Sequence, residues 1–407
     1  MDQYEDIFMG VHFDDSSVDP TIKRFGIHEW NEERFQILGK IRQQSVDFAQ
    51  QNAFDFYFVS DVDNFIVPST LESLVNLNLQ AVAPMLRLAV PERTENPHEH
   101  GGYSNFCFTD ESLWFRKTPE YFDILNGRTP GVHQVDLIHC TYLLRSDIYP
   151  KVDFLAISGN WEYKNLIISL RSQGVRIYLD SRHDYGILTL SEGLTDAKFQ
   201  FEHLKYLQEN RKTLTETEKA FINIYAKAFW GYRSGSGSYP DNALPYTEYV
   251  NKILSNPAIV NILEIGCGDF RLGSKYNLSG KNYLGIDVNA PLIQDLERFE
   301  TISIKFLSVD FVDERFTGDW DLILVKDVLQ HLPNSLIKLA LDKIIKSSKF
   351  AVICNDRSSE NFDVPVGGYR GLDLSRDPFN YDFKKVFEFG LKDVHIHSTG
   401  KDVSLEI

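Results

Sequence analysis

Short apolar runs and longer amphipathic stretches alternate along this chain, as they do in α/β proteins. Runs of strand length, such as 54–68 and 260–265, are separated by stretches in which apolar residues recur at helical spacing. This pattern fills residues 1–192 and, with a different rhythm, the carboxy-terminal part from 231 to 407. No internal repeat links the two parts. We therefore predict two α/β domains.

The segment between the two domains differs from both. Residues 195–230 are rich in helix formers and contain neither glycine nor proline, which predicts a helical linker over about 193–230. Residues 231–245, GYRSGSGSYPDNALP, concentrate glycine, serine and proline. Such a stretch is commonly a flexible linker, but its position directly before a cofactor-type fold also fits a loop that covers a ligand. Both interpretations remain open.

Composition excludes several classes of protein. The 407 residues carry a formal net charge of -16, so attraction to a nucleic-acid backbone is not expected. No apolar run approaches the ~18–20 residues that span a bilayer, and the polar start MDQYED lacks the features of a signal peptide. We expect a cytoplasmic protein. The four cysteines form no CxxC pair, which favours reduced thiols at Cys107, Cys140, Cys267 and Cys354.

The carboxy-terminal part begins with a strand that runs into a glycine turn. VNILEIGCGDF places Gly266 and Gly268 directly after an apolar run, where backbone amides can approach a ligand. The next strand ends about 20 residues later in Asp287, a position from which a carboxylate can bind both ribose hydroxyls. A dinucleotide fingerprint would need a glycine at position 271, but Arg271 stands there. A nicotinamide cofactor is therefore disfavoured.

Over residues 228–407 these motifs resemble the class I S-adenosylmethionine-dependent methyltransferases, which have a Rossmann-like fold. The resemblance implies that Glu264 belongs to the motif around the methionine moiety, that Asp287 holds the ribose, and that Asp310 lies near the adenine amino group. It also assigns KFAVICND to the fifth strand, and KKVFEFG and KDVSLEI to the closing antiparallel hairpin. GYRSGSGS and GGYRGLDLSRDPF are similar to segments of a bacterial subgroup of these enzymes. Phe270 departs from the family, because many members have a third glycine there.

A methyltransferase needs a base only when its acceptor is a hydroxyl of high pKa. His331 and Asp327 follow the fourth strand, at the rim where acceptors bind in such folds, and are the candidate bases. The alternative for His331 is a polar residue near the start of the next helix.

In the amino-terminal part, FDFYFVSDVDNFIVP, at 54–68, is predicted to be a buried apolar strand that stops at Asp61 and Asp63. Two carboxylates separated by one residue can hold a divalent cation that neutralises a diphosphate leaving group. The alternative is that these loop aspartates only cap turns, as loop aspartates often do. Ser69 and Glu72 follow at the spacing of a capping box, which predicts a helix start.

From His28 to about Leu190 the sequence resembles the GT-A type glycosyltransferase domain of procollagen galactosyltransferases. The resemblance rests on HEWNEERFQILGKIRQQSV, DFYFVSDVDNFIVPSTLESL, AVAPM, YSNF, IHCTYL and RIYLDSRHDYG. It implies that Asp61 and Asp63 bind manganese (or magnesium) and the sugar diphosphate, and that Asn105 and His139 line the site. It further implies a uridine diphosphate donor carrying galactose or glucose. IFMGVHFDDSS, at 7–17, resembles the second strand of this domain, so we expect the first strand of the domain to be missing from this sequence.

Four further residues have two interpretations each. Glu162 falls where the resembled family has an acidic pair, so it is the candidate base for glycosyl transfer or a helix-start glutamate. His183 is a candidate third metal ligand or a solvated turn residue. Trp161, like Trp114, either stacks on a sugar face or serves packing.

Together these observations predict a bifunctional glycan-modifying enzyme. It would transfer a sugar from a nucleotide sugar in a metal-dependent reaction and a methyl group from S-adenosylmethionine to a sugar hydroxyl. Its partners would be the sugar donor and a glycan or glycoconjugate acceptor. The alternative is a methyltransferase whose amino-terminal domain is a non-catalytic module that positions the glycan.

Overall fold

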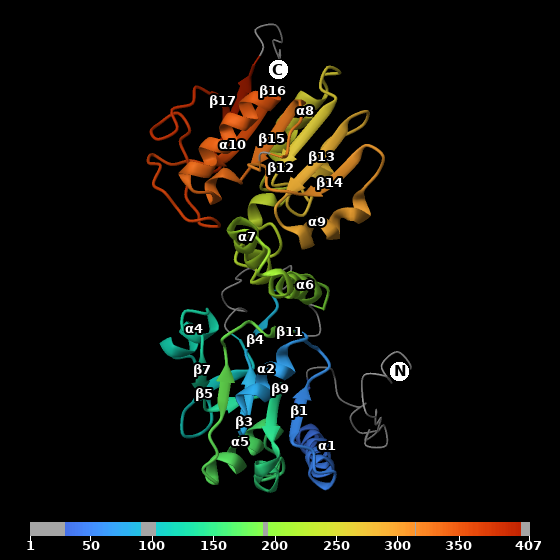
Figure 1. Ribbon diagram of the computed structural model, residues 1–407, viewed down its shortest axis with the longest axis vertical. Helices are drawn as coiled ribbons and strands as arrows, with labels where there is room; N and C mark the ends of the chain where they lie inside the picture. Colours follow the sequence, from blue (N-terminus) through green and yellow to red (C-terminus); the bar gives the residue numbers. More distant parts are fainter. Residues whose placement is uncertain (1–28, 91–102, 190–193, 314, 400–407) are drawn as a thin grey trace. The chain divides into compact units, whose positions relative to one another are not determined.

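The computed structural model describes residues 29–90, 103–189, 194–313 and 315–399 (Figure 1). These residues form two compact units, each a mixed α/β structure, as predicted. Unit 1 comprises the described residues within 1–89 and 98–191, and unit 2 those within 90–97 and 192–407. The segment at 7–17 lies outside the described residues.

Unit 1 is built on a five-stranded sheet with the order β1-β9-β3-β10-β7. Only β3 and β10 pair in parallel, while the other neighbours are antiparallel. The strands are β1 (Phe56–Ser60), β3 (Ala81–Pro84), β7 (Val132–Gln134), β9 (Thr141–Arg145) and β10 (Tyr178–Asp180). Two small sheets of three strands accompany it, with the orders β2-β11-β4 and β6-β5-β8. Their strands are β2 (Asn64–Ile66), β4 (Leu86–Leu88), β5 (Phe106–Thr109), β6 (Phe115–Arg116), β8 (Leu137–Ile138) and β11 (Gly186–Leu188).

Helices pack on this sheet through apolar faces. The segment before the aspartate pair forms the long helix α1 (Glu32–Gln51), and Asn31 caps it by accepting the N–H of Arg34 at 3.0 Å. Val46 and Ala49 of α1 share one core with Leu166 and Leu170 of α5. The other helices of the unit are α2 (Thr70–Leu77), α4 (Pro119–Leu125), α5 (Glu162–Ser172) and the 3-10 turn η2 (Ser146–Lys151).

Two local predictions in unit 1 were wrong. The first strand, β1, ends directly before Asp61 as predicted, but it is half-buried rather than buried because it is the edge strand of its sheet. A second short strand, β2, follows the turn at Asp61–Asp63. Ser69 precedes α2, but its side chain makes no cap hydrogen bond. Its backbone is already helical, and the next amide, Thr70 N–H, donates to the carbonyl of Val67 at 3.0 Å. No capping box forms there.

Unit 2 begins with the helices that occupy the predicted linker. These are α6 (Leu194–Asn210) and α7 (Glu216–Ala226), and α7 starts with a capping box between Thr215 and Glu218. Both helices are part of unit 2. The chain then passes through the glycine–serine segment, with the 3-10 turn η3 (Ser236–Ser238), into α8 (Leu244–Leu254).

The centre of unit 2 is a seven-stranded sheet with the order β14-β13-β12-β15-β16-β18-β17. The first five strands are parallel, and the last two form an antiparallel hairpin. The strands are β12 (Asn261–Ile265), β13 (Asn282–Asp287), β14 (Ile304–Ser308), β15 (Trp320–Lys326), β16 (Ser348–Asp356), β17 (Lys384–Phe389) and β18 (Lys392–Ser398). The predicted Rossmann-like fold and closing hairpin are therefore confirmed. The second hairpin strand, however, is 392–398, whereas KDVSLEI at 401–407 lies outside the described residues.

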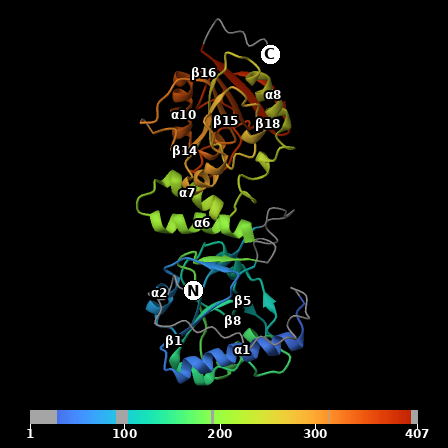
Figure 2. The ribbon, with the colours of Figure 1, turned by 90° about the vertical axis from the view of Figure 1, so that its right-hand side faces the viewer.

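Helices cover both faces of this sheet. α8 packs on one face through Tyr246 and Val250, and α10 (Asn334–Ser347) packs on the other through Ile337 and Leu341. Figure 2 shows these two helices on opposite sides of β15. The remaining elements are α9 (Ala290–Leu296) and the 3-10 turns η4 (Gly273–Lys275), η5 (Glu297–Phe299) and η6 (Leu329–His331). With its faces covered, the sheet offers its carboxyl edge for a site.

None of the helices in the described ranges combines the length and apolarity that crossing a membrane requires.

Gly186 gives a direct test of the packing in unit 1. It lies in β11, between β2 and β4, where an added Cβ would approach the carbonyl oxygen of Phe65 to 2.1 Å. We expect Gly186→Ala to lower the free energy of unfolding by about 1–3 kcal/mol or more, as overpacking does. Gly131→Ala is the control, since its Cβ would meet no atom closer than 3.4 Å. Equal denaturant midpoints for the two variants would contradict the prediction.

Candidate functional site

A cavity of about 600 Å³ opens at the carboxyl edge of the sheet in unit 2. Its wall contains the predicted residues Glu264, Gly266, Gly268, Asp287, Asp310, Asp327 and His331. Helix α7 contributes Phe221 and Tyr225 to the same wall. The structure thus brings together all the residues that the sequence proposed for a methyl-donor site and its base.

The glycine turn after β12 depends on both of its glycines. Gly266 and Gly268 have φ angles of 68° and 54°, in the region that favours glycine. A Cβ on Gly266 would lie 2.3 Å from Cγ2 of Val328, and one on Gly268 would lie 2.5 Å from Oγ of Ser234. Phe270, where a third glycine was expected, also has a positive φ of 58° and is buried against Tyr283 and Phe306. The aromatic ring therefore serves the core.

Two acidic residues at neighbouring strand ends face the cavity. Asp287 accepts the backbone N–H groups of Gly268 at 3.2 Å and Asn289 at 3.0 Å, and burial raises its pKa to about 6. Asp310 accepts the N–H of Val312 at 3.1 Å, and burial raises its pKa as well. Each carboxylate keeps acceptor capacity, since a carboxylate offers about four lone-pair positions.

Glu264 lies deeper than the two aspartates. Its carboxyl oxygens accept hydrogen bonds from the hydroxyls of Tyr276, at 3.1 Å, and Tyr283. Burial raises its pKa to about 7, against an ordinary value of 4.5. A Cβ on Gly273 would lie 3.1 Å from its Oε2, so the carboxyl also packs closely against η4. Glu264 therefore ties the end of β12 to Tyr276 and Tyr283.

The glycine–serine segment closes one side of the cavity. Residues 234–238 line it, and the segment is held at both ends of this stretch. Ser234 Oγ accepts the N–H of Asp269 at 2.9 Å, and Lys326 Nζ donates to the carbonyl of Gly237 at 2.9 Å. These contacts favour the ligand-covering loop over a flexible linker.

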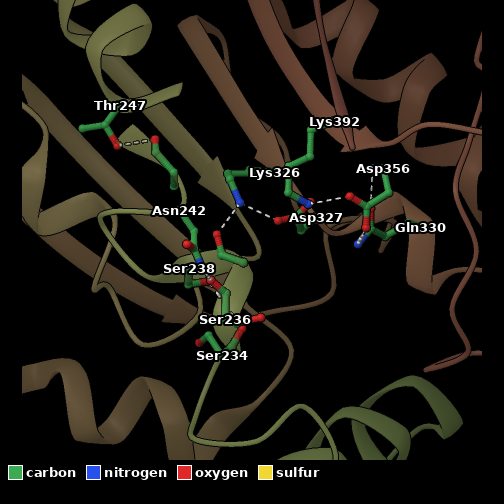
Figure 3. Close-up of polar contacts among 12 residues, drawn as sticks. Ser234, Ser236, Ser238, Asn242, Thr247, Lys326, Asp327, Gln330, Asp356 and Lys392 are labelled. Carbon is green, nitrogen blue, oxygen red and sulfur yellow. Dashed lines mark hydrogen bonds and ion pairs between the residues drawn. The ribbon is translucent and has the colours of Figure 1, made fainter. Parts of the chain in front are cut away.

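Four charged side chains alternate along the cavity rim (Figure 3). Lys326 pairs with Asp327, and Lys392 Nζ donates to Asp327 Oδ1 at 2.6 Å and to Asp356 Oδ1 at 2.9 Å. Asp327 also has a positive φ of 58°. Each of its carboxyl oxygens accepts from an ammonium group, so Asp327 is placed as an ion-pair partner, and its role as a base is disfavoured.

The imidazole of His331 is held in a defined orientation. Its Nδ1 lies 2.7 Å from the carbonyl oxygen of Gly368, and its ring lies 4.6 Å from that of Trp230 and 5.9 Å from that of Tyr369. A carbonyl oxygen only accepts, so Nδ1 carries the proton and Nε2 keeps its lone pair. Burial lowers the pKa of His331 and favours this neutral form.

In unit 1, the predicted metal ligands do not form one group. Asp61 forms an ion pair with Arg42 of α1, whereas Asp63 and His183 are exposed. Within the described ranges, no three side chains of His, Cys, Asp or Glu lie close enough to hold a metal ion. The described residues of unit 1 therefore do not fit a metal ion held by protein ligands alone.

Other predicted residues of unit 1 lie around Asp61. His139 is buried, and its Nε2 has no hydrogen-bond partner among the described residues; the same holds for the buried Oε2 of Glu162. The charge of Asp61 acts on both groups, and burial raises the pKa of Glu162. Two unpartnered polar atoms near one carboxylate suit a polar ligand.

Asn105 and the two tryptophans have other surroundings. The Asn105 amide donates to the carbonyls of Pro84 and Thr141 and accepts the N–H of Leu86, so it joins backbone segments. Trp161 packs in an aromatic cluster with Phe35, 4.3 Å away. Trp114 is 67% exposed.

Comparison with known families identifies the amino-terminal part. The sequence model described as "Glycosyltransferase family 25, N-terminal domain" matches residues 2–204. The amino-terminal part is a glycosyltransferase family 25 domain. Human procollagen galactosyltransferase 2 is 31% identical over 174 residues, covering 40% of this chain and 26% of that protein. Human inactive glycosyltransferase 25 family member 3 is 29% identical over 192 residues, covering 44% of this chain and 30% of the relative.

This chain spans about a third or less of the length of these family 25 relatives. Among solved structures, it is similar to the N-methyltransferase NodS from Bradyrhizobium japonicum WM9 in complex with S-adenosyl-l-homocysteine, at 20% identity and a TM-score of 0.32, covering 39% of this chain and 87% of that one. Magnesium protoporphyrin IX methyltransferase from Synechocystis PCC 6803 is similar at 11% identity and a TM-score of 0.33, covering 45% of this chain and 97% of that one.

Sequence reasoning missed several residues of the site. Trp230 and Tyr369 flank His331, Lys392 joins two aspartates, and Arg42 pairs with Asp61. The segment GGYRG was noted in the sequence, but nothing in its composition connects it to His331. Lys326 is the exception, because it directly precedes the candidate base Asp327 in the sequence.

The buried carboxyl of Glu264 makes stability depend on pH. The unfolded carboxyl ionises near 4.5 and the folded one near 7, so between these values the folded state binds more protons and the free energy of unfolding falls as pH rises. We expect Glu264→Gln to remove a decrease on the order of 3 kcal/mol, since one pKa unit corresponds to about 1.4 kcal/mol. Urea unfolding across this interval measures it, with the exposed Glu297→Gln as control. Parallel pH profiles for wild type and Glu264→Gln would contradict it.

Proposed function

We propose that unit 2 transfers a methyl group from S-adenosylmethionine to a hydroxyl group of a sugar. The observation that carries this proposal is the cavity at the carboxyl edge, where the glycine turn, two acceptor carboxylates and an imidazole with an available lone pair meet. The donor fits these residues, because Gly266 and Gly268 line the cavity and place no side chain between it and the backbone of the turn.

Different residues of the cavity wall bind different parts of the methyl donor. Asp287 accepts hydrogen bonds from the two ribose hydroxyls, and Asp310 accepts from the adenine amino group. The loop at 234–238 covers the donor and keeps water away. S-adenosylmethionine supplies an electrophilic methyl group when it is bound. Since the protein has only to align this group with the acceptor, rigid placement of the cavity wall contributes most to the rate.

His331 holds the proton that the acceptor loses. Its Nε2 accepts from the acceptor hydroxyl while Nδ1–H stays bound to the carbonyl of Gly368. The rings of Trp230 and Tyr369 beside it are suited to the apolar face of a sugar. Asp356 and Lys392, also in the cavity wall, can bind neighbouring hydroxyls.

We further propose that the family 25 domain binds a uridine diphosphate sugar and transfers galactose or glucose, which makes the chain a bifunctional glycan-modifying enzyme. The support is the family match together with the unpartnered His139 Nε2 and Glu162 Oε2 near Asp61. Glu162 would accept the proton of the acceptor hydroxyl. Tethering the two activities raises the local concentration of the first product for the second reaction.

A second candidate for the family 25 domain is a non-catalytic module that positions a glycan for methylation. The ion pair between Arg42 and Asp61 favours it, because the guanidinium already neutralises the carboxylate that manganese would need. One of the similar proteins also carries the name "Inactive glycosyltransferase 25 family member 3".

Calorimetric titration of S-adenosylhomocysteine into the full chain tests the methyl-donor site. We expect one binding site per chain and a loss of about 100-fold in affinity in Asp287→Ala, since hydrogen bonds to a charged group contribute about 1.5–3 kcal/mol. Asp319→Ala, at an exposed position, is the control and should bind as the wild type does. Absence of binding by the folded wild type would refute the methyltransferase proposal.

Titration of uridine diphosphate, with and without manganese, distinguishes the two candidates for the family 25 domain. Glycosyl transfer predicts binding that requires manganese and is lost in Asp63→Ala but kept in Asp47→Ala, an exposed control on α1. A positioning module predicts no manganese-dependent binding in any of these proteins. Manganese-dependent binding that survives Asp63→Ala would show that the proposed aspartate pair is wrong.

A further inference from the structure

Arg370 is a fully buried arginine whose hydrogen bonds converge on the turn that carries His331. Only 2% of Arg370 is exposed. Its Nη1 donates to the carbonyls of Leu332 at 2.6 Å and Gln330 at 3.2 Å, and its Nη2 donates to Oδ1 of Asn334 at 2.8 Å. The 3-10 turn η6 and the residues that follow it are thus held by one guanidinium.

The backbone around Arg370 contacts the same turn. Gly367 N–H donates to the carbonyl of His331 at 2.9 Å, and Arg370 N–H donates to that of Gln330 at 3.2 Å. In the other direction, His331 Nδ1–H donates to the carbonyl of Gly368 at 2.7 Å. We call residues 367–370 the brace. It binds the backbone and the side chain of His331 at once.

The brace depends on close backbone approach. Gly367 has a φ of 78°, and a Cβ on Gly368 would lie 2.9 Å from the carbonyl oxygen of Pro365. Larger residues at these two positions would distort the turn that 364–368 forms. The first two glycines of the GGYRG motif therefore have a structural reason that the sequence alone did not show.

A buried guanidinium is costly unless its charge is compensated. Within the described ranges no carboxylate forms an ion pair with Arg370, and burial lowers its pKa. The backbone carbonyls of Gln330 and Leu332, Oδ1 of Asn334 and the charge of Asp363 compensate it instead, and Nε is left without a partner among the described residues. An apolar residue would fill this space at lower cost. The presence of an arginine at position 370 is therefore explained better by the geometry that its hydrogen bonds impose on η6 than by a contribution to the stability of the fold.

We propose that Arg370 is a positioning residue that, through the brace, keeps the proton of His331 on Nδ1 and presents Nε2 to the cavity. This inference rests on the proposed methyl transfer and deepens it: a fixed Nε2 lone pair suits an acceptor that gives up a proton from oxygen. The charged side chains around the imidazole are Asp327, Asp356 and Lys392, and their mutual ion pairs leave the carbonyl of Gly368 as the partner that selects the tautomer.

Nitrogen-15 NMR of the full chain labelled at histidine tests this proposal without an acceptor. The His331 signals are assigned by their loss in His331→Gln. In the wild type we expect the neutral tautomer with the proton on Nδ1. A proton on Nε2 in the wild type would overturn the proposal before any variant of Arg370 is made.

Variants then test the role of the guanidinium. Arg370→Met should convert His331 to a mixture of tautomers, and Arg370→Lys, which keeps one donor, should give a smaller shift. Arg376→Met removes an exposed arginine of the next turn and is the matched control. S-adenosylhomocysteine affinity is measured on every variant and should stay within about twofold of the wild type, because the brace lies on the acceptor side.

The outcomes separate the two proposals. A tautomer shift at unchanged donor affinity supports the positioning role. An unchanged tautomer in a folded Arg370→Met would overturn it, and Arg370→Lys gives the same decision if the methionine variant does not fold. Failure of the wild type to bind S-adenosylhomocysteine would remove the proposed function, while the tautomer would still report on the brace.

Discussion

The parallel pairing of β12 with β13 and β15 is the constraint on which the site of unit 2 depends. β12 is the middle one of the five parallel strands, with Ile262 opposite Tyr283 on one side and Leu322 on the other. Parallel strands end at the same edge, so each turn after a strand delivers its first polar residue to one place. The glycine turn, Asp287 and the Lys326–Asp327 pair meet there for this reason, although they are far apart in the sequence.

Bringing so many polar groups to one edge requires compensation for the water they lose. The carboxyl of Glu264 is compensated by two tyrosine hydroxyls, Asp287 by backbone amides, and Asp327 by two lysines. Among the described residues of the cavity wall, His331 Nε2 keeps its lone pair because Nδ1 already binds the carbonyl of Gly368. Arg370 belongs to the same pattern with the opposite charge, because carbonyl groups surround it.

Unit 1 compensates its central carboxylate differently. Asp61 lies in a turn at the edge of the sheet, where Arg42 reaches it from α1. The buried but unpartnered His139 Nε2 and Glu162 Oε2 retain the capacity to bind a polar ligand. Asp61 could thus belong to a sugar-donor site or to a module that binds no metal. The ion pair with Arg42 distinguishes the two, because it neutralises the carboxylate that a metal ion would need.

The sequence by itself determined the two α/β units, the glycine turn and the acidic strand ends, because burial patterns and turn residues are encoded by neighbours in the chain. It misjudged β1, whose exposure depends on its place at the sheet edge. Only the tertiary structure decided that Arg370 would bind Leu332, 38 positions away, and that Lys392 would join Asp327, 65 positions away. The partner of a long charged side chain depends on which backbone segments fold together, and the local sequence pattern does not predict it.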